Sequence, residues 1–403
     1  MPHQNVEHLQ PDPHALRQLV AVSLLVHLLG VCILVAFSGG LNEISRDSYW
    51  YHYRGVIGAE QYALKTNDWS RWIDEGWREF IPLVYYLIGP NLLYILIVNA
   101  MLAAASATLL YRISLAVFCS SPVALASAYL FTLFPSFVYY TCLPLKEAPA
   151  VFGILCIVWG VVGNRLKQSS PWLVWLLAGF AIIAALRVYL VIVLAGCVVI
   201  CFLPLRLTAT MGGIIRLFFC GVGLFVLAYF VVDFYNIEIS DSEATMYYDF
   251  ERVNQMRESM SRGGSRLFQR RSDAIFSDNP FDIGWKVLLG LTFFIFSVDP
   301  FKIGEGRQAA ALPELLFFLY CIPYLFHGVV QAWKRMPQRI LPVFLIGGAI
   351  VLVYSSTTTN AGTMTRWRCQ AIPYLVMLVV YGAAVCRRGL LYQFLQKLNS
   401  RAS

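Results

Sequence analysis

Long apolar runs constrain the fold of this chain more than any other feature of its sequence. A helix needs about 20 predominantly apolar residues to cross the hydrocarbon core of a membrane. Runs that reach or approach this length cover residues 17–38, 91–113, 122–141, 146–163, 171–186, 188–205, 215–234, 311–332, 340–357 and 370–386. The sequence therefore predicts an all-α polytopic membrane protein with about ten transmembrane helices.

The composition supports this fold class. Hydrophobic residues make up 58% of the chain and charged residues only 13%, and a soluble domain cannot bury that much apolar surface. The net charge of +8 could indicate nucleic-acid binding. However, the Lys and Arg residues fall in short clusters between apolar runs rather than along one polar face. We therefore expect membrane lipids, and no nucleic acid, as partners.

The basic clusters between the runs predict the orientation of the chain. Cytoplasmic loops of membrane proteins carry an excess of Lys and Arg. The clusters are Arg165 with Lys167, Arg206 with Arg216, Lys334 with Arg335 and Arg339, and Arg387, Arg388, Lys397 and Arg401 in the tail. An even number of crossings places both termini on the cytoplasmic side, and two long polar loops, 41–80 and 235–312, then lie outside.

An apolar stretch inside the second loop, residues 283–298, has the pattern of a further helix. Counting it as a span would move the basic cluster at Lys334 to the outer face. We therefore expect this stretch to lie along the membrane or to re-enter it, as a non-spanning interfacial helix. The whole chain, 1–403, is then one transmembrane domain, in which 313–403 form the C-terminal helices.

Two acidic residues near the predicted outer face are candidates for chemistry. Asp47 lies just beyond the first run and could accept a proton from an attacking hydroxyl, although from Asp47 alone an ordinary solvated aspartate is the better interpretation. Glu147 begins a predicted span directly after Pro144 and Lys146. In that first turn the helix dipole favours a negative group, so a structural cap is an equal alternative. Lys146 could be the ion-pair partner of Glu147 or could bind a lipid phosphate.

Three arginines near the predicted outer ends of spans are candidates for phosphate binding. Arg187, followed by Tyr189, lies at the junction of two short runs, which fits a tight hairpin. Its side chain could bind a phosphate or extend to the membrane interface. Arg366 and Arg368 lie in what we expect to be a short outer loop, against the positive-inside tendency. Phosphate binding or acceptor recognition would explain their position.

Taken together, these residues resemble the GT-C glycosyltransferases related to protein O-mannosyltransferases and lipid A aminoarabinose transferases. The similarity covers about residues 19–190. Its carriers are Asp47 with Tyr51, the passage from Phe80-Ile81-Pro82 to Gly89-Pro90-Asn91, Asn99 in the second span, and Phe134-Pro135-Ser136 leading into Leu145-Lys146-Glu147. The segments around Arg187 with Tyr189 and around Arg366 with Arg368 are similar to arginine-bearing segments at comparable places in this family.

The resemblance implies a GT-C-like bundle with amphipathic juxtamembrane helices on its outer face, in a bacterial cytoplasmic (inner) membrane. Asp47 would be the catalytic base, and Glu147 would be the acidic residue of the next outer loop. Residues that would bind the donor phosphate or the substrate are Lys146, Arg187, Tyr189, Arg366, Arg368 and Tyr51. The family often has a second acidic residue beside its loop aspartate, whereas Asp47 is flanked by Arg46 and Ser48. We therefore expect no cofactor and no metal site, with a divalent metal left open.

We thus expect a hexosyl- or pentosyltransferase of GT-C type. It would transfer a sugar from a polyprenyl-phosphate-linked donor to the hydroxyl of a glycan or lipid-linked acceptor at the periplasmic face, with inversion. Two alternatives stay open: an O-antigen or exopolysaccharide polymerase that uses polyprenyl-diphosphate-linked repeats, and a lipid-linked sugar flippase or transporter. The mid-span segments carry almost no ionisable groups, which favours chemistry at one face over passage through the membrane.

Overall fold

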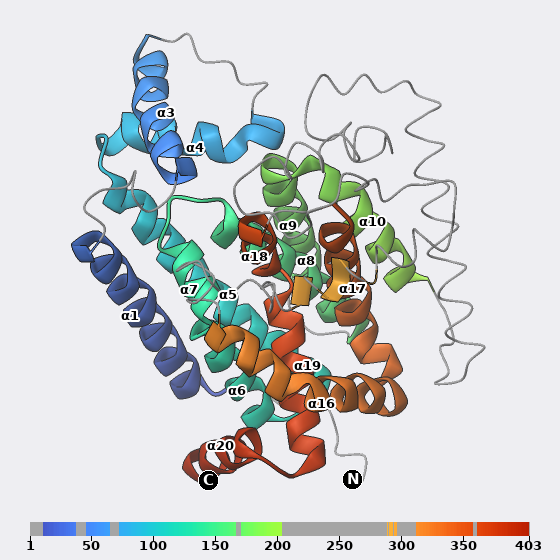
Figure 1. Cartoon of the computed structure of the whole chain (residues 1–403). Helices are drawn as coiled ribbons and strands as arrows, with labels where there is room; N and C mark the ends of the chain where they lie inside the picture. The colour runs from blue at the N-terminus through green and yellow to red at the C-terminus, as the bar shows by residue number, and fades with distance from the viewer. Residues whose placement is uncertain are drawn as a thin grey trace. The chain divides into compact units, whose positions relative to one another are not determined.

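A computed structural model describes residues 11–37, 46–64, 72–166, 171–203, 288, 290–292, 294–295, 312–357 and 361–402. All of its regular structure is helical, and these residues contain no strand (Figure 1). The predicted all-α fold class is confirmed for this part of the chain. The predicted span 215–234 lies outside the described residues, as does most of the predicted loop 235–312.

The chain divides into two compact units, which are described separately: Met1–Val188 with Gln393–Ser403, and Tyr189–Tyr392. The first unit holds α1 (Pro13–Phe37), α3 (Arg46–Ala63), α4 (Trp72–Ile88), α5 (Leu92–Phe118), α6 (Ser121–Thr132), α7 (Pro135–Thr141), α8 (Glu147–Arg165) and α9 (Trp172–Leu186). The second holds α10 (Val188–Phe202), α16 (Leu312–Arg335), α17 (Pro337–Thr357), α18 (Ala361–Arg368) and α19 (Ile372–Cys386), and α20 (Leu390–Ala402) begins there.

Several helices have the length and composition of membrane spans. In the described ranges five qualify singly: Pro13–Ala36, Leu92–Phe118, Glu147–Arg165, Leu312–Arg335 and Pro337–Ser355. Two bent pairs, Ser121–Thr132 with Pro135–Thr141 and Gly362–Arg368 with Ile372–Cys386, raise the number to seven if each pair is one span. The chain is therefore a polytopic membrane protein. The expected number of ten crossings is not reached by these helices.

Proline explains why the predicted run 122–141 is not one straight helix. Pro135 has no backbone N–H and restricts the residue before it, so a helix cannot continue through this point undisturbed. The chain bends by 55° between α6 and α7. α7 then ends at Thr141, and the turn that follows leads into α8.

Small residues bring helices of the first unit close together. A Cβ added to Gly179 of α9 would lie 2.6 Å from the carbonyl oxygen of Gly153 in α8. Similarly, a Cβ on Gly76 of α4 would lie 2.7 Å from the carbonyl oxygen of Ala185 in α9. Membrane helices commonly use small residues for such close backbone approach. These contacts hold α9 against α8 and against α4.

α3 and α4 lie against each other at one end of the first unit and are not among the candidate spans (Figure 1). In α3 the buried residues Ser48, Tyr51 and Gly55 recur at helical spacing, whereas Tyr49 and Tyr53 are exposed. α3 is therefore amphipathic, as expected of a helix that lies at a surface. The position of this pair relative to a membrane stays a prediction.

The prediction of a short loop around Arg366 and Arg368 is wrong. These residues belong to the helix α18, which precedes α19 with a bend of 62°. Met364, Trp367 and Arg368 are buried on one side of α18. Their spacing of three and four residues is that of a helix face packed against its surroundings.

Candidate functional site

The turn between α7 and α8, residues 142–146, forms the centre of the candidate site. Its side chains Cys142, Leu143 and Leu145 are buried, so its backbone carbonyls need partners from the protein. Irregular backbone at membrane depth is tolerated only where its polar groups are satisfied internally. The partners therefore determine whether this turn has a defined conformation.

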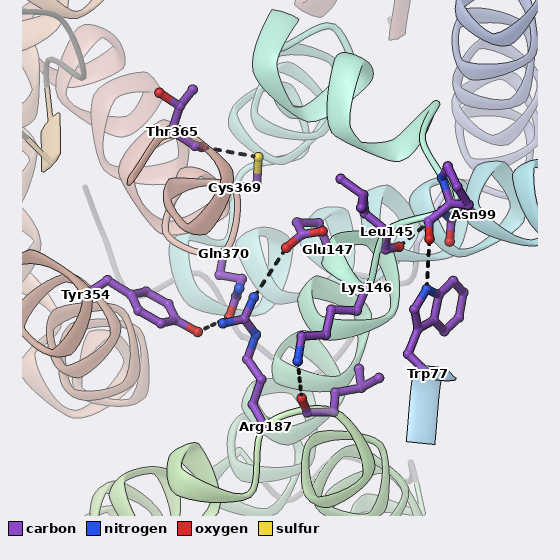
Figure 2. Close-up of polar contacts among 12 residues, drawn as sticks. Trp77, Asn99, Leu145, Lys146, Glu147, Arg187, Tyr354, Thr365, Cys369 and Gln370 are labelled. Carbon is purple, nitrogen blue, oxygen red and sulfur yellow. Dashed lines mark hydrogen bonds and ion pairs between the residues drawn. The ribbon is translucent and has the colours of Figure 1, made fainter. Parts of the chain in front are cut away.

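Side chains of α4 and α5 supply these partners (Figure 2). Asn99 donates from Nδ2 to the carbonyl oxygens of Leu143, at 2.7 Å, and Leu145, at 3.3 Å. Trp77 donates from Nε1 to the carbonyl oxygen of Pro144 at 3.0 Å. Three successive carbonyls are thus held by two buried side chains. The turn is consequently fixed, and it presents Lys146 and Glu147 at the start of α8.

Lys146 and Glu147 make reciprocal contacts with the end of α9 (Figure 2). Lys146 donates from Nζ to the carbonyl oxygen of Leu186 at 3.0 Å. Arg187, the C-cap of α9, contacts Glu147 with 3.2 Å between Nη2 and Oε1. A cation near the C-terminus of α9 and an anion in the first turn of α8 both interact favourably with the helix dipoles. The two helix ends are thereby joined by two charge-assisted contacts.

Burial makes the Glu147–Arg187 pair important for folding. The side chains are 0% and 2% exposed, respectively. Removing one partner of such a pair leaves a buried charge without compensation, which typically costs about 3–5 kcal/mol. Glu147 and Arg187 therefore hold α8 and α9 in place, and both the structural and the functional interpretation of Glu147 remain compatible with this geometry.

Asp47 lies in the first turn of α3, and its side chain is exposed. One turn later, the ring of Tyr51 packs into a buried cluster that includes Trp77, Leu145 and Leu186. Leu145 and Leu186 are the immediate neighbours of Lys146 and Arg187. α3 therefore brings a solvent-accessible carboxylate to the edge of the cluster that surrounds the fixed turn. The structure places Glu147 and Arg187 in contact, and it places Asp47 on α3, which packs against α4.

A hydrogen bond between α3 and α4 links His52 to Tyr85. His52 Nδ1 and Tyr85 Oη are 2.8 Å apart. Burial lowers the pKa of His52 and raises the pKa of Tyr85, because the charged form of each group loses hydration. Both groups are therefore held in their neutral forms, and the contact joins the two helices without a net charge.

The second unit contains its own buried ion pair. Arg368 of α18 is fully buried, contacts the carboxylate of Glu314 in the first turn of α16, and donates from Nη1 to the carbonyl oxygen of Ile295 at 2.8 Å. Its guanidinium also lies over the ring of Phe318, 5.2 Å from the centroid. Arg366, two residues earlier and on another side of α18, is half-buried.

Other polar residues of the second unit are also buried. Tyr354 of α17 donates from Oη to Oε1 of Gln370 at 2.7 Å (Figure 2), and its ring packs against Trp367. Tyr189, in the first turn of α10, is buried. The predicted binding residues Tyr189, Arg366 and Arg368 thus belong to the second unit, whereas Tyr51, Lys146 and Arg187 belong to the first.

No protein-family model and no curated protein sequence matches this chain. In the ranges that the structure describes, no three His, Cys, Asp or Glu side chains come together as a possible metal site.

Sequence reasoning missed two residues of these sites. Trp77 holds the turn through Pro144, but the sequence offers only one Trp among several in a polar loop. Glu314 directly follows Pro313 at the start of a predicted span, and the structure shows that it pairs with Arg368. A pairing between residues 54 positions apart leaves no local pattern, so no sequence signal could have identified it.

Proposed function

We propose that this protein is a GT-C-like glycosyltransferase. It transfers a sugar from a polyprenyl-phosphate-linked donor to a hydroxyl of a glycan or lipid-linked acceptor. The observation that carries the proposal is the exposed carboxylate of Asp47 on α3, whose neighbour Tyr51 packs in the same cluster as Leu145 and Leu186. That cluster surrounds the turn that fixes Lys146 and Glu147. Asp47 and Glu147 follow one another along the chain in the same order as the two acidic residues of the family that the sequence resembles.

Asp47 acts as the base in this proposal. Its exposed carboxylate accepts the proton of the acceptor hydroxyl while the hydroxyl oxygen attacks the anomeric carbon of the donor. The bond between that carbon and the phosphate oxygen breaks on the opposite side, so the configuration inverts. The polyprenyl phosphate leaves with the bonding electrons, and nearby cations stabilise its developing charge.

Glu147, Lys146 and Arg187 act mainly as positioning residues. Their mutual contacts keep the ends of α8 and α9 and the turn 142–146 in one arrangement. A fixed arrangement matters because catalytic groups lose much of their effect when they are displaced by about 1 Å. Tyr51 has a comparable role, since its ring anchors the first turns of α3 to the cluster.

The proposal includes a membrane arrangement with ten crossings and both termini inside. The five single spans and the two bent pairs, the shorter apolar helices α9 and α10, and the run 215–234 together make up this number. Positive loops on the cytoplasmic side of a bacterial inner membrane place Asp47 at the periplasmic face. The proposed step does not require a metal, and a divalent metal stays an open alternative.

A transfer assay tests the proposal. The purified chain, in lipid nanodiscs, receives a radiolabelled polyprenyl-phosphate sugar and a pool of periplasmic glycan and lipid acceptors. We expect label to appear in an acceptor with the parent chain and a loss of at least 100-fold with Asp47→Asn, which keeps the size of the side chain but removes the base. Asp12→Asn, at an exposed position just before α1, is the matched control and should retain the parent rate.

The same assay separates the alternatives. Processive growth of repeats from a polyprenyl-diphosphate donor would identify a polymerase. Movement of the donor between leaflets without transfer to any acceptor would identify a transporter. A parent-like transfer rate in Asp47→Asn would refute the role of Asp47 as base.

A further inference from the structure

The pair of helices α3 and α4 carries two arginines that the proposed function has not used. Arg54 of α3 and Arg78 of α4 both lie over the indole ring of Trp50, with their guanidinium carbons 5.3 and 4.7 Å from the ring centroid. Arg54 is exposed, and the side chain of Arg78 is 39% exposed. Two cations from two helices thus converge on one aromatic ring at a solvent-accessible position.

The packing of α3 on α4 fixes the distance between these arginines. A Cβ added to Gly55 would lie 2.6 Å from a methyl carbon of Ile81, and one added to Gly58 would lie 2.7 Å from the ring of Pro82. The helices are therefore in close contact just beyond Arg54 in α3 and just beyond Arg78 in α4. Trp50 itself is partly buried and packs against the cluster that contains Tyr51. The convergence of the two cations is consequently a property of the packed pair of helices.

The two arginines bring two positive charges to one aromatic ring. Glu75 forms an ion pair with Arg78, one turn away on α4. For Arg54, the described part of the chain shows the contact with Trp50 and no ion pair. Arg54, Arg78 and Glu75 together carry one positive charge in excess, Asp47 carries a negative charge two turns before Arg54 on α3, and the two guanidinium groups repel each other. A bound anion would relieve that repulsion.

The chemistry of arginine points to a phosphate. A guanidinium that lies over an aromatic ring still has the N–H groups at its edge, which match phosphate oxygens in bidentate geometry. Asp47, Trp50 and Arg54 follow one another at spacings of three and four residues on α3, so they lie along one side of that helix. A phosphate bound here would lie beside the proposed base.

Two of the three arginines that the sequence suggested for this role are less suitable. Arg187 and Arg368 are both buried and are held by Glu147 and Glu314, respectively. A phosphate could reach either guanidinium only by displacing a buried carboxylate, which would then lack its partner. Arg54 and Arg78 can bind an anion without that cost.

We infer that Arg54 and Arg78, arranged by Trp50, bind the phosphate of the lipid-linked sugar donor. This inference rests on the proposed function for the identity of the donor. The occupant is a polyprenyl monophosphate headgroup, because two exposed guanidinium groups present N–H donors to one phosphate group and the exposed, stacked rings of Tyr49 and Tyr53 on the same helix offer apolar surface to the prenyl chain. Arg54 and Arg78 thereby take the role of the donor-phosphate ligands.

Binding of farnesyl phosphate to the purified full chain in detergent micelles tests this inference by isothermal titration. We expect Arg54→Gln and Arg78→Gln each to weaken binding by about 10-fold or more, and the double variant to weaken it further. Arg17→Gln removes the same charge from an exposed position in α1 and should bind as the parent does. Farnesol, which lacks the phosphate, should not distinguish the variants.

Two further variants separate ligand binding from a structural role. Glu75→Gln removes a competing carboxylate and keeps both arginines, so it should bind farnesyl phosphate as tightly as the parent or more tightly. Arg54→Lys keeps the charge but loses the fork of N–H donors, and it should fall between the parent and Arg54→Gln. Thermal unfolding without ligand should be similar for all of these variants.

Several outcomes would overturn the inference. Parent-like binding in the double variant, an equal loss in Arg17→Gln, or inorganic phosphate binding as tightly as farnesyl phosphate would each do so. If the parent chain transfers sugar while the double variant binds farnesyl phosphate normally, the proposed function stands and this site is wrong. If binding depends on both arginines but no transfer occurs, the site stands and the proposed function is wrong.

Discussion

Glu147 and Arg187 form an ion pair whose side chains are almost completely removed from water, whereas Glu75 and Arg78 form one that is about 40% exposed on each side. The same chemical contact has different consequences in these two places. Water solvates an exposed carboxylate when its partner is removed, so such pairs contribute about 0–1 kcal/mol. A buried carboxylate or guanidinium that loses its partner is not solvated by water, so its charge stays uncompensated.

This difference gives a prediction at the residue scale. Glu147→Gln should reduce the apparent free energy of unfolding by about 3–5 kcal/mol, because it leaves Arg187 buried without its anion. Replacing both residues with Met should recover most of that loss. Glu75→Gln is the matched control and should cost no more than about 1 kcal/mol. Unfolding in mixed micelles, followed by circular dichroism, measures all three; equal losses in Glu147→Gln and Glu75→Gln would contradict the structural role of the buried pair.

His52 gives a pH dependence at the same scale. Burial lowers its pKa in the folded state below the ordinary value of 6.5, so the unfolded chain binds its proton more readily. Folding stability from this group is therefore fully present above pH 6.5 and is lost as the pH falls through the lower folded-state pKa. We expect the parent to lose more stability than His52→Gln between pH 7.5 and pH 5, measured by thermal unfolding. Identical pH profiles would rule out this contribution.

At the scale of elements, the close approach of α8 and α9 depends on glycine. Gly179→Ala places a methyl group 2.6 Å from the carbonyl oxygen of Gly153, and overpacking of this kind typically costs about 1–3 kcal/mol. Gly196 of α10 is a matched control, because a Cβ there meets nothing within 4 Å. Gly196→Ala should be neutral or stabilising, since Ala favours helix over Gly by about 1 kcal/mol. A comparison of thermal unfolding temperatures decides between these expectations, and an equal response of the two variants would mean that α8 and α9 are not in close contact.

The elements themselves were largely predictable, and their irregularities were not. Apolar periodicity and length locate α5, α8, α9 and α10 close to their predicted ranges, and Arg187 is correctly predicted to separate the last two. The bend at Leu133 between α6 and α7 depends on how Pro135 is packed, so the run 122–141 appears continuous in sequence. The helix α18 was missed because its residues are polar on average. Its burial comes from contacts such as that of Arg368 with Glu314, which are distant in sequence.

The candidate site shows the same limit. Asp47, Lys146, Glu147 and Arg187 could be selected from sequence as charged residues near the ends of apolar runs. Their partners could not be selected, since the contact of Lys146 with the carbonyl oxygen of Leu186 and the pairing of Arg187 with Glu147 exist only after α8 and α9 pack. The sequence therefore indicates where charged residues lie. It does not indicate which of them are already paired with another group of the protein.

At the scale of the whole molecule, the number of crossings determines on which side each terminus lies. The candidate spans of the described ranges number at most seven, and seven crossings alone would place the termini on opposite sides. If α9 and α10 each cross and the run 215–234 crosses as well, the number becomes ten and the termini share one side. If α9 and α10 together form a single crossing, the number is nine and the termini lie on opposite sides.

Reporter tags resolve this parity. We expect tags at both termini and within the Lys334–Arg339 cluster to report the cytoplasm, because positively charged loops remain there. Tags after Gly40 and near Ser265 should report the outside, on the same side as Asp47. A fused alkaline phosphatase, active only outside, and a fused green fluorescent protein, fluorescent only inside, give opposite signals at each position. Since the proposed base must face the compartment that holds the acceptor, an outside signal at the Lys334–Arg339 cluster would refute the ten-crossing arrangement and with it the periplasmic placement of Asp47.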